Sequence, residues 1–206
     1  IPVDKDRCMD MEILRSRIHD LCKNRDIFCL TATAGTTSTG SIDPLKELAD
    51  LCADFDIWLH VDGAYGMAFS LLPEMQEKFN AILIDAPCSG LGVVRRHPDI
   101  RWHRKPADLL RYQEIQLSLL ACSVPLLTPG GTLVYVTCSI EPEENDRVID
   151  KFLAKHPDFQ VVSCLDSLPE YGSCLVDQQG FFRTLPGQHD MDGFFAAKLL
   201  KLKTED

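Results

Sequence analysis

A carboxylate and a thiol follow one short apolar stretch, and both side chains could do chemistry there. Residues 79–84 are mostly apolar, and the stretch ends abruptly at Asp85, followed by Pro87, Cys88 and Gly90. This pattern is typical of a buried strand that runs into an exposed turn. Ligands of open α/β sheets bind outside the carboxyl ends of the strands, so this acid and thiol are candidate site residues. The alternative is a structural turn with a small buried cysteine.

A second stretch repeats this arrangement further along the chain. Two glycines precede an apolar run over residues 132–136, and Cys138 follows in the tripeptide 137–139. Two strand ends therefore each present a cysteine. A nucleophilic role for Cys138 requires a lowered pKa of its thiol, and the acidic stretch Glu141 to Glu144 acts against this unless its carboxylates face solvent.

Length and composition restrict the class of protein. The chain has 206 residues, 45% of them hydrophobic, and a formal net charge of −10. It is long enough to bury a core and contains no apolar run of membrane-spanning length, which predicts a soluble, cytoplasmic protein. The nine cysteines include no CxxC pair and do not cluster with the six histidines. We therefore expect reduced thiols and no metal site.

A local excess of positive charge favours an RNA-binding surface. Between Val93 and Ile115 six cations stand against three acids, with Trp102 among them. Such a patch can face phosphates, although a solvated loop and helix start would look the same. The cations are Arg95, Arg96, Arg101, Arg104, Lys105 and Arg111.

Residues 78–201 closely resemble the Sun/RsmB family of RNA cytosine-5 methyltransferases. The resemblance rests on DAPCSG at 85–90, RRHPD at 95–99, TCS at 137–139 with EEN at 143–145, and DGFF at 192–195. It implies S-adenosylmethionine as cofactor and ribosomal RNA as substrate.

The same resemblance assigns roles at the two strand ends. Carbon 5 of cytosine is a poor nucleophile, but addition of a thiolate at carbon 6 produces an enamine that can attack an electrophilic methyl group. By resemblance Cys138 is that thiolate, Cys88 assists elimination at carbon 5, and Asp85 hydrogen-bonds the base. The target base must be unstacked to reach them.

Residues 1–74 resemble a different family, the group II pyridoxal-phosphate-dependent amino-acid decarboxylases. The similarity rests on the string TATAGTTSTGSIDPLKELADLC and on WLHVDGAYG. It implies that Asp62 pairs with the cofactor's pyridine nitrogen, that Ala64 touches its ring, and that Thr36 or Thr37 lies near it. The turn of small residues 34–40 could hold a phosphate through backbone N–H groups.

Each of the two segments lacks the main cofactor anchor of the family it resembles. The decarboxylase Schiff-base lysine, which belongs to a DPHKW-like string, is absent, as are the AAPGGKT-like turn and the ribose-binding acid of the methyltransferases. The sequence therefore predicts a chimera whose methyltransferase activity is lost or impaired. A non-catalytic chimeric fold and a pyridoxal-phosphate-binding remnant are the alternatives.

Both segments predict the same fold class. We expect a three-layer, Rossmann-like α/β sandwich in one composite domain, residues 1–206, made of a segment 1–77 and a segment 78–206. The sheet should be mainly parallel, with strands 159–162 and 193–199 as an antiparallel C-terminal edge pair. Expected helices include 10–22, 43–55 (with Asp43 as its cap), 106–127 and 142–155. In the third of these Gln113 and Gln116 are expected on the surface.

Overall fold

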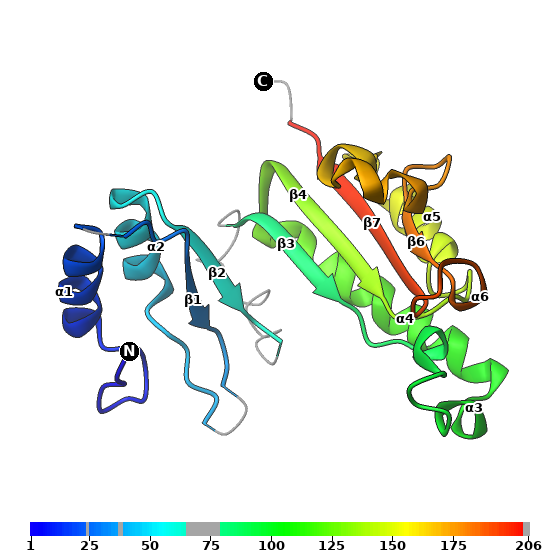
Figure 1. Cartoon of the computed structure of the whole chain (residues 1–206), viewed down its shortest axis with the longest axis horizontal. Coiled ribbons are helices and arrows are strands. Elements are labelled where there is room, and N and C mark those ends of the chain that lie inside the picture. Colours follow the sequence, from blue (N-terminus) through cyan, green and yellow to red (C-terminus); the bar gives the residue numbers. More distant parts are fainter. Residues whose placement is uncertain (24, 37–38, 65–78, 204–206) are drawn as a thin grey trace. The chain divides into compact units, whose positions relative to one another are not determined.

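The structure is a computed structural model that describes residues 1–23, 25–36, 39–64 and 79–203. The chain divides into two compact units, Ile1–Leu71 and Leu72–Asp206. Each unit is described by itself (Figure 1). The boundary expected between residues 77 and 78 lies outside the described residues, so the single composite domain stays a prediction.

The N-terminal unit is a two-stranded parallel sheet with two helices. Strands β1 (Cys29–Thr33) and β2 (Trp58–Asp62) pair in register from Cys29 opposite Trp58 to Thr33 opposite Asp62. Helices α1 (Met11–Leu21) and α2 (Leu45–Asp54) supply most of the core, because their apolar positions recur at helical spacing. The buried side chains are Leu14, Ile18, Ala32, Leu48, Leu51, Cys52 and Ile57.

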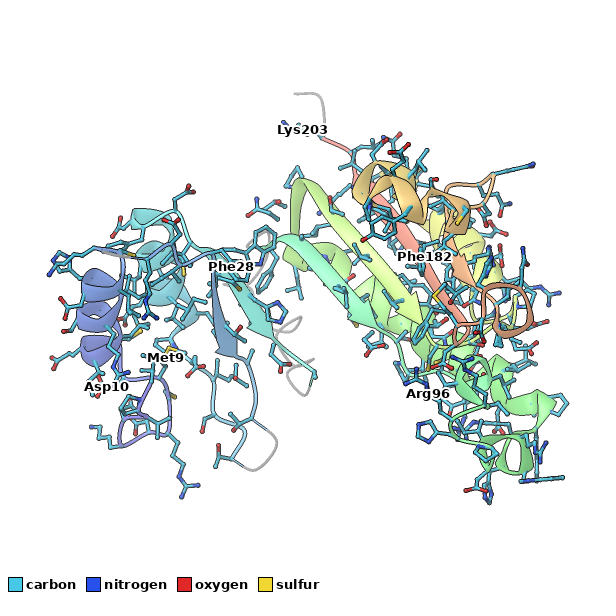
Figure 2. The ribbon with its side chains drawn as sticks, viewed as in Figure 1. Met9, Asp10, Phe28, Arg96, Phe182 and Lys203 are labelled. Carbon is cyan, nitrogen blue, oxygen red and sulfur yellow. The ribbon has the colours of Figure 1, made fainter. Side chains whose placement is uncertain are left out.

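Asp10, the first residue of the expected helix 10–22, is the N-cap of α1. Its side chain accepts a hydrogen bond from the backbone N–H of Ile13 at 3.1 Å, and Figure 2 labels it at the start of this helix. Asp10→Ala leaves that N–H without its protein partner, and we expect a loss of about 1 kcal/mol in the stability of this unit. Chemical denaturation followed by circular dichroism measures it, with Glu12→Ala on the same turn as control; equal losses for both variants would contradict the capping role.

Asp43 does not cap α2, which corrects the sequence prediction. The N-cap position is Pro44, which makes no side-chain cap hydrogen bond. The Asp43 carboxylate instead accepts hydrogen bonds from the backbone N–H groups of Met9 at 2.7 Å and Thr33 at 2.8 Å. It therefore ties the N-terminal segment to the end of β1, a long-range role that local helix-start patterns do not reveal.

The C-terminal unit contains a five-stranded sheet of order β3-β4-β7-β5, with β6 pairing to β7. Strands β3 and β4 are parallel, whereas β7 is antiparallel to β4, β5 and β6. The expected Rossmann-like α/β class, with its antiparallel C-terminal edge pair β7 and β5, is confirmed. The strands are β3 (Phe79–Asp85), β4 (Leu127–Thr137), β5 (Phe159–Val162), β6 (Phe182–Thr184) and β7 (Phe194–Lys201).

Two helices pack on one face of this sheet (Figure 1). Both α4 (Pro106–Ser123) and α5 (Asp146–Lys155) contribute to the core, with Leu120 from α4 and Phe152 from α5 almost completely buried. They pack against alternate residues of β4 and β7, because successive side chains of a strand point to opposite faces. The shorter helices are η3 (Leu91–Val93), α3 (Ile100–His103), η4 (Val124–Leu126), η5 (Cys164–Ser167), η6 (Glu170–Leu175) and α6 (Pro186–His189).

Candidate active site

The carboxyl ends of β3 and β4 lie next to each other in the parallel pair. Asp85 is opposite Val136 in the register, and the N–H of Ala86 donates to the carbonyl of Val136 at 2.9 Å. After these residues each strand ends in a loop, and the two loops carry Cys88 and Cys138. The two sulfur atoms are 3.3 Å apart and both side chains are half-buried. The structure therefore brings together the two cysteines that the sequence singled out.

Two glycines lock the cysteine loops in this position. The N–H of Gly92 donates to the carbonyl of Cys138 at 3.0 Å, and the N–H of Gly193 donates to the carbonyl of Gly92 at 2.8 Å. A Cβ atom on Gly92 would lie 2.0 Å from the carbonyl oxygen of Gly193. Only a residue without a side chain permits this approach, which joins the Cys88 loop, the Cys138 loop and the start of β7.

The two thiols have opposite pKa shifts. The hydrogen bond with Cys138, together with burial, raises the pKa of Cys88 well above its ordinary value. The hydrogen bond donated by Cys88 lowers the pKa of Cys138 from 9.0 to about 7, against the opposing effects of burial and of the Asp85 and Glu144 charges. Cys138 is therefore the thiolate near neutral pH and Cys88 its proton-bearing partner. The nearby acids do not prevent this, because the thiol–thiol hydrogen bond outweighs them.

A buried carboxylate joins the residues that follow the two cysteines. Glu144 is fully buried, and its oxygens accept hydrogen bonds from the N–H of Ser89 at 2.7 Å, the hydroxyl of Ser89 at 2.5 Å and the hydroxyl of Ser139 at 2.6 Å. Each serine directly follows one of the cysteines. Glu144 does not face solvent, and its charge raises the pKa of Cys138, the effect that the sequence predicts for an acid that is not exposed.

Two glutamines of α4 also belong to this region, which corrects their assignment to the surface. The side-chain amide of Gln116 donates to the carbonyl of Pro87 at 3.0 Å and to Glu144 at 3.3 Å. Gln113 donates to the carbonyl of Glu143 at 2.5 Å. Both glutamines are buried, Gln116 against the loop that carries Cys88 and Gln113 against the segment that follows Cys138. Their spacing of three residues, continued by Leu120, was the signal of a shared buried face.

Asp85 is exposed at the end of β3. Its charge raises the pKa of Cys138, and it is the last residue of the strand whose following loop carries Cys88. The side chain is thus available to a polar group of a bound ligand.

The four arginines expected to bind RNA have different partners. Arg95 and Arg96 both pair with the nearly buried carboxylate of Asp192, at 2.6 Å and 2.5 Å. Arg104 donates to the carbonyl of Ser89 at 2.9 Å. The guanidinium of Arg101 lies 4.7 Å from the ring centre of the exposed Trp102.

A pocket of about 580 Å³ opens among these residues. Figure 2 labels Arg96 at the end of the unit where β3 and β4 finish. Since Arg104 lines the pocket and also holds the carbonyl of Ser89, the pocket is joined to the cysteine loop. Its lining is Arg96, His97, Pro98, Asp99, Ile100, His103 and Arg104.

The candidate cofactor residues of the N-terminal unit lie at the carboxyl end of its sheet. Asp62 is exposed, and its carboxylate accepts a hydrogen bond from the N–H of Ala64 at 3.1 Å. The Thr36 hydroxyl contacts that of Thr39 at 2.5 Å. Thr37 lies outside the described residues.

The turn after β1 does not offer a phosphate site in its described part, which corrects the expectation. The N–H groups of Gly35 and Thr36 both donate to the carbonyl of Ser41 at 3.1 Å, and the N–H of Gly40 donates to Thr36 at 2.8 Å. The N–H of Ser41 donates to the Thr36 hydroxyl at 3.1 Å. These donors are satisfied within the turn, so they are not directed at a ligand.

Neither a cluster of metal ligands nor a membrane-spanning helix is found in the described part of the chain. No group of three or more His, Cys, Asp and Glu side chains is placed to hold a metal ion there. None of its helices is long and apolar enough to cross a membrane.

Comparison with known families identifies the larger part of the chain. The family model described as 16S rRNA methyltransferase RsmB/F matches residues 50–200. The chain belongs to this family. A second model, the pyridoxal-dependent decarboxylase conserved domain, matches residues 1–85, so the two matches overlap over residues 50–85.

Over the aligned residues, curated ribosomal RNA methyltransferases are almost half identical to this chain. The probable ribosomal RNA small subunit methyltransferase B of Bacillus subtilis is 47% identical over 126 residues, which are 61% of this chain and 28% of that protein. The Shewanella oneidensis ribosomal RNA small subunit methyltransferase B is 48% identical over 125 residues, again 61% of this chain and 28% of that protein. The matched part thus spans little more than a quarter of these relatives.

Two solved structures have a fold similar to that of this chain. A methyltransferase homolog protein from Pyrococcus horikoshii is 26% identical and aligns with a TM-score of 0.54 over 85% of this chain and 62% of that chain. NSun6 from Pyrococcus horikoshii, solved with SFG, aligns with a TM-score of 0.53 at 23% identity, over 91% of this chain and 44% of that chain.

Proposed function

We propose that the C-terminal unit is the thiol-bearing part of an RNA cytosine-5 methyltransferase, which adds a cysteine thiolate reversibly to carbon 6 of a cytosine. The observation that carries this proposal is the 3.3 Å separation of the Cys88 and Cys138 sulfurs at adjacent strand ends. Membership of the RsmB/F family and the ribosomal RNA methyltransferases among its relatives support RNA as the substrate. The cytoplasm, where thiols remain reduced, is the compartment that suits this chemistry.

The residues have distinct roles in this proposal. The Cys138 thiolate attacks carbon 6, which forms a carbon–sulfur bond and moves the electron pair toward carbon 5 as an enamine. Asp85 hydrogen-bonds the base and holds it for attack. Elimination reverses the addition: a base removes the hydrogen from carbon 5, the carbon–sulfur bond breaks, and Cys138 leaves as thiolate. Cys88 assists that elimination, because its thiol is adjacent to the leaving sulfur and donates a hydrogen bond to the departing Cys138 thiolate.

RNA is bound by the positive patch around the pocket. Arg101, stacked on the exposed Trp102, offers a free guanidinium edge and an aromatic surface for a single-stranded base or phosphate. Arg95 and Arg96 share the charge of Asp192, so their role is to shape the loop as well as to contact phosphates. Arg104 contributes from the pocket wall and connects bound RNA to the Cys88 loop.

The residues of the N-terminal unit do not fit either cofactor. S-adenosylmethionine requires backbone donors in a glycine-rich turn, and the described N–H groups of the turn after β1 are bonded within that turn. Pyridoxal phosphate requires the absent Schiff-base lysine, although Asp62 and Ala64 stand at the expected strand end. We therefore propose that residues 1–77 are a decarboxylase-like segment in place of the methyltransferase cofactor half, and that complete methyl transfer is lost or strongly impaired.

Hydrogen exchange at carbon 5 tests the thiolate addition without any cofactor. When the thiolate adds to carbon 6, carbon 5 takes a proton from solvent, and elimination can then release the original hydrogen. We expect single-stranded RNA incubated with the protein in D₂O to gain deuterium at cytosine carbon 5, as measured by mass spectrometry of the nucleosides. Cys138→Ala should abolish the exchange, and Cys122→Ala, which removes an exposed thiol elsewhere on the unit, should preserve it.

Calorimetric titration with S-adenosylmethionine is the companion measurement. We expect no stoichiometric binding, because the glycine turn is missing. Tight binding would contradict the proposed impairment, whereas exchange that persists in Cys138→Ala would contradict the assigned nucleophile.

A further inference from the structure

We propose that Glu144 is a positioning residue that holds the sulfurs of Cys88 and Cys138 at their working separation through the two serines that follow them. This inference rests on the thiol pair of the proposed function. The inference is tested by the pH dependence of thiol alkylation, which needs no RNA. A failure of this inference can therefore be distinguished from a failure of the proposed RNA chemistry.

The hydrogen bonds around Glu144 form a symmetrical bridge. The hydroxyls of Ser89 and Ser139 both donate to the same carboxylate oxygen, at 2.5 Å and 2.6 Å. The other oxygen accepts from the N–H of Ser89 at 2.7 Å and from Gln116 at 3.3 Å. One buried carboxylate thereby fixes the residue after each cysteine, and with it the distance between the two loops.

The position of Glu144 is itself fixed by the strand that carries Cys138. The Tyr135 hydroxyl donates to the carbonyl of Glu144 at 2.6 Å. The neighbouring Asn145 accepts from the Thr137 hydroxyl at 2.7 Å and donates to the carbonyl of Ser139 at 2.9 Å. These bonds hold the backbone of Glu144 and its neighbour in place. The carboxylate can therefore position the Cys88 loop, which follows β3, relative to the end of β4.

Burying the Glu144 carboxylate without a positively charged partner costs free energy unless hydrogen-bond donors satisfy its oxygens. Glu144 is fully buried, and no ion pair within the described residues involves it. A buried carboxylate must then be satisfied by hydrogen bonds, and the four donors supply them. Loss of the carboxylate would leave the two serine hydroxyls without their common acceptor, so we expect the loops to separate.

The direction in which the pKa of Cys138 changes when Glu144 is replaced distinguishes a positioning role of Glu144 from a purely electrostatic one. The negative charge of Glu144 raises the pKa of Cys138, so an electrostatic role alone predicts a lower Cys138 pKa in every neutral variant. Positioning predicts the opposite for Glu144→Ala, because separation of the sulfurs removes the hydrogen bond from Cys88, which is the main cause of the low Cys138 pKa.

Alkylation of Cys138 as a function of pH, followed by peptide mass spectrometry on the full chain, is the test. We expect Glu144→Ala to move the midpoint for Cys138 upward by about one pH unit or more. Glu143→Ala, which removes the neighbouring carboxylate that pairs with Arg147, should leave it unchanged. A midpoint for Glu144→Ala that is lower or unchanged would overturn the proposal.

Variants of the two serines provide a second test if Glu144→Ala does not fold. Ser89→Ala and Ser139→Ala each remove one hydroxyl of the bridge and leave the carboxylate in place. Each should raise the midpoint, and the double variant should raise it by less than the sum, since either change already removes one of the two hydroxyls that share a Glu144 oxygen, while the N–H of residue 89 can still donate to the other oxygen. Unchanged midpoints in both folded variants would refute the bridge.

Discussion

Replacement of Cys88 by alanine is expected to move the pH midpoint of Cys138 alkylation from about 7 to 9.0 or above. The Cys88 thiol donates the hydrogen bond that stabilises the Cys138 thiolate, and burial and two nearby carboxylates oppose ionisation. Without the donor only the backbone N–H of Cys138 still favours the thiolate. At pH 7 the thiolate fraction should fall from about one half to about one in a hundred.

The midpoint is a better readout than the rate at a single pH. A thiolate with a higher pKa is intrinsically more nucleophilic, which partly compensates for its lower population. Iodoacetamide labelling across pH 5 to 10, resolved to the Cys138 peptide, separates the two effects. Cys122→Ala is the matched control and should keep the Cys138 midpoint near 7. An unchanged midpoint in Cys88→Ala would show that Cys88 does not donate to Cys138.

Gly92→Ala is expected to destabilise the C-terminal unit by about 3 kcal/mol, at the upper end of the cost of overpacking. The new Cβ would lie 2.0 Å from the carbonyl oxygen of Gly193 and 2.8 Å from that of Cys138. Both contacts are with backbone atoms, so neither can be relieved by a side-chain rotation. The loops must separate, which also breaks the hydrogen bond from Gly92 to Cys138.

Urea denaturation monitored by tryptophan fluorescence measures this loss. Gly187→Ala is the control in the same unit, since a Cβ there meets no atom within 4 Å. We expect Gly187→Ala to change the stability by less than 1 kcal/mol. Equal midpoints for the wild type and Gly92→Ala would contradict the close approach of the two glycines.

The sequence predicts the elements and the two thiols because these depend on local patterns. The apolar run before Asp85 and the helical spacing in α1, α4 and α5 each follow from the periodicity of one segment. The strand 159–162 is found at its expected residues. The expected strand 132–136 proves longer, since β4 begins at Leu127 and includes the two glycines that precede the apolar run. The extension rests on pairing with β3, because Leu127 is opposite Phe79 in that register, whereas pairing with β7 begins only at Thr132.

Polar contacts between segments far apart in sequence could not be predicted from local sequence patterns. Acidic residues are common before a helix, so Glu144 looked like an ordinary helix-start acid next to Glu143. Its burial follows from Ser89, which lies 55 positions away in sequence. The contact of Gly92 with Gly193 likewise joins distant segments. Such contacts depend on which strands become neighbours, and single-segment periodicity does not specify that.

Phenylarsine oxide binding tests the central claim most directly, because trivalent arsenic bridges two thiols only where their sulfurs lie within reach of one atom. The sulfurs of Cys88 and Cys138, 3.3 Å apart, should form one such site. We expect one arsenic that joins the Cys88 and Cys138 peptides in mass spectrometry, and its loss from this site in either Cys88→Ala or Cys138→Ala. Peptides that carry no shared arsenic would show that the two sulfurs do not face one another.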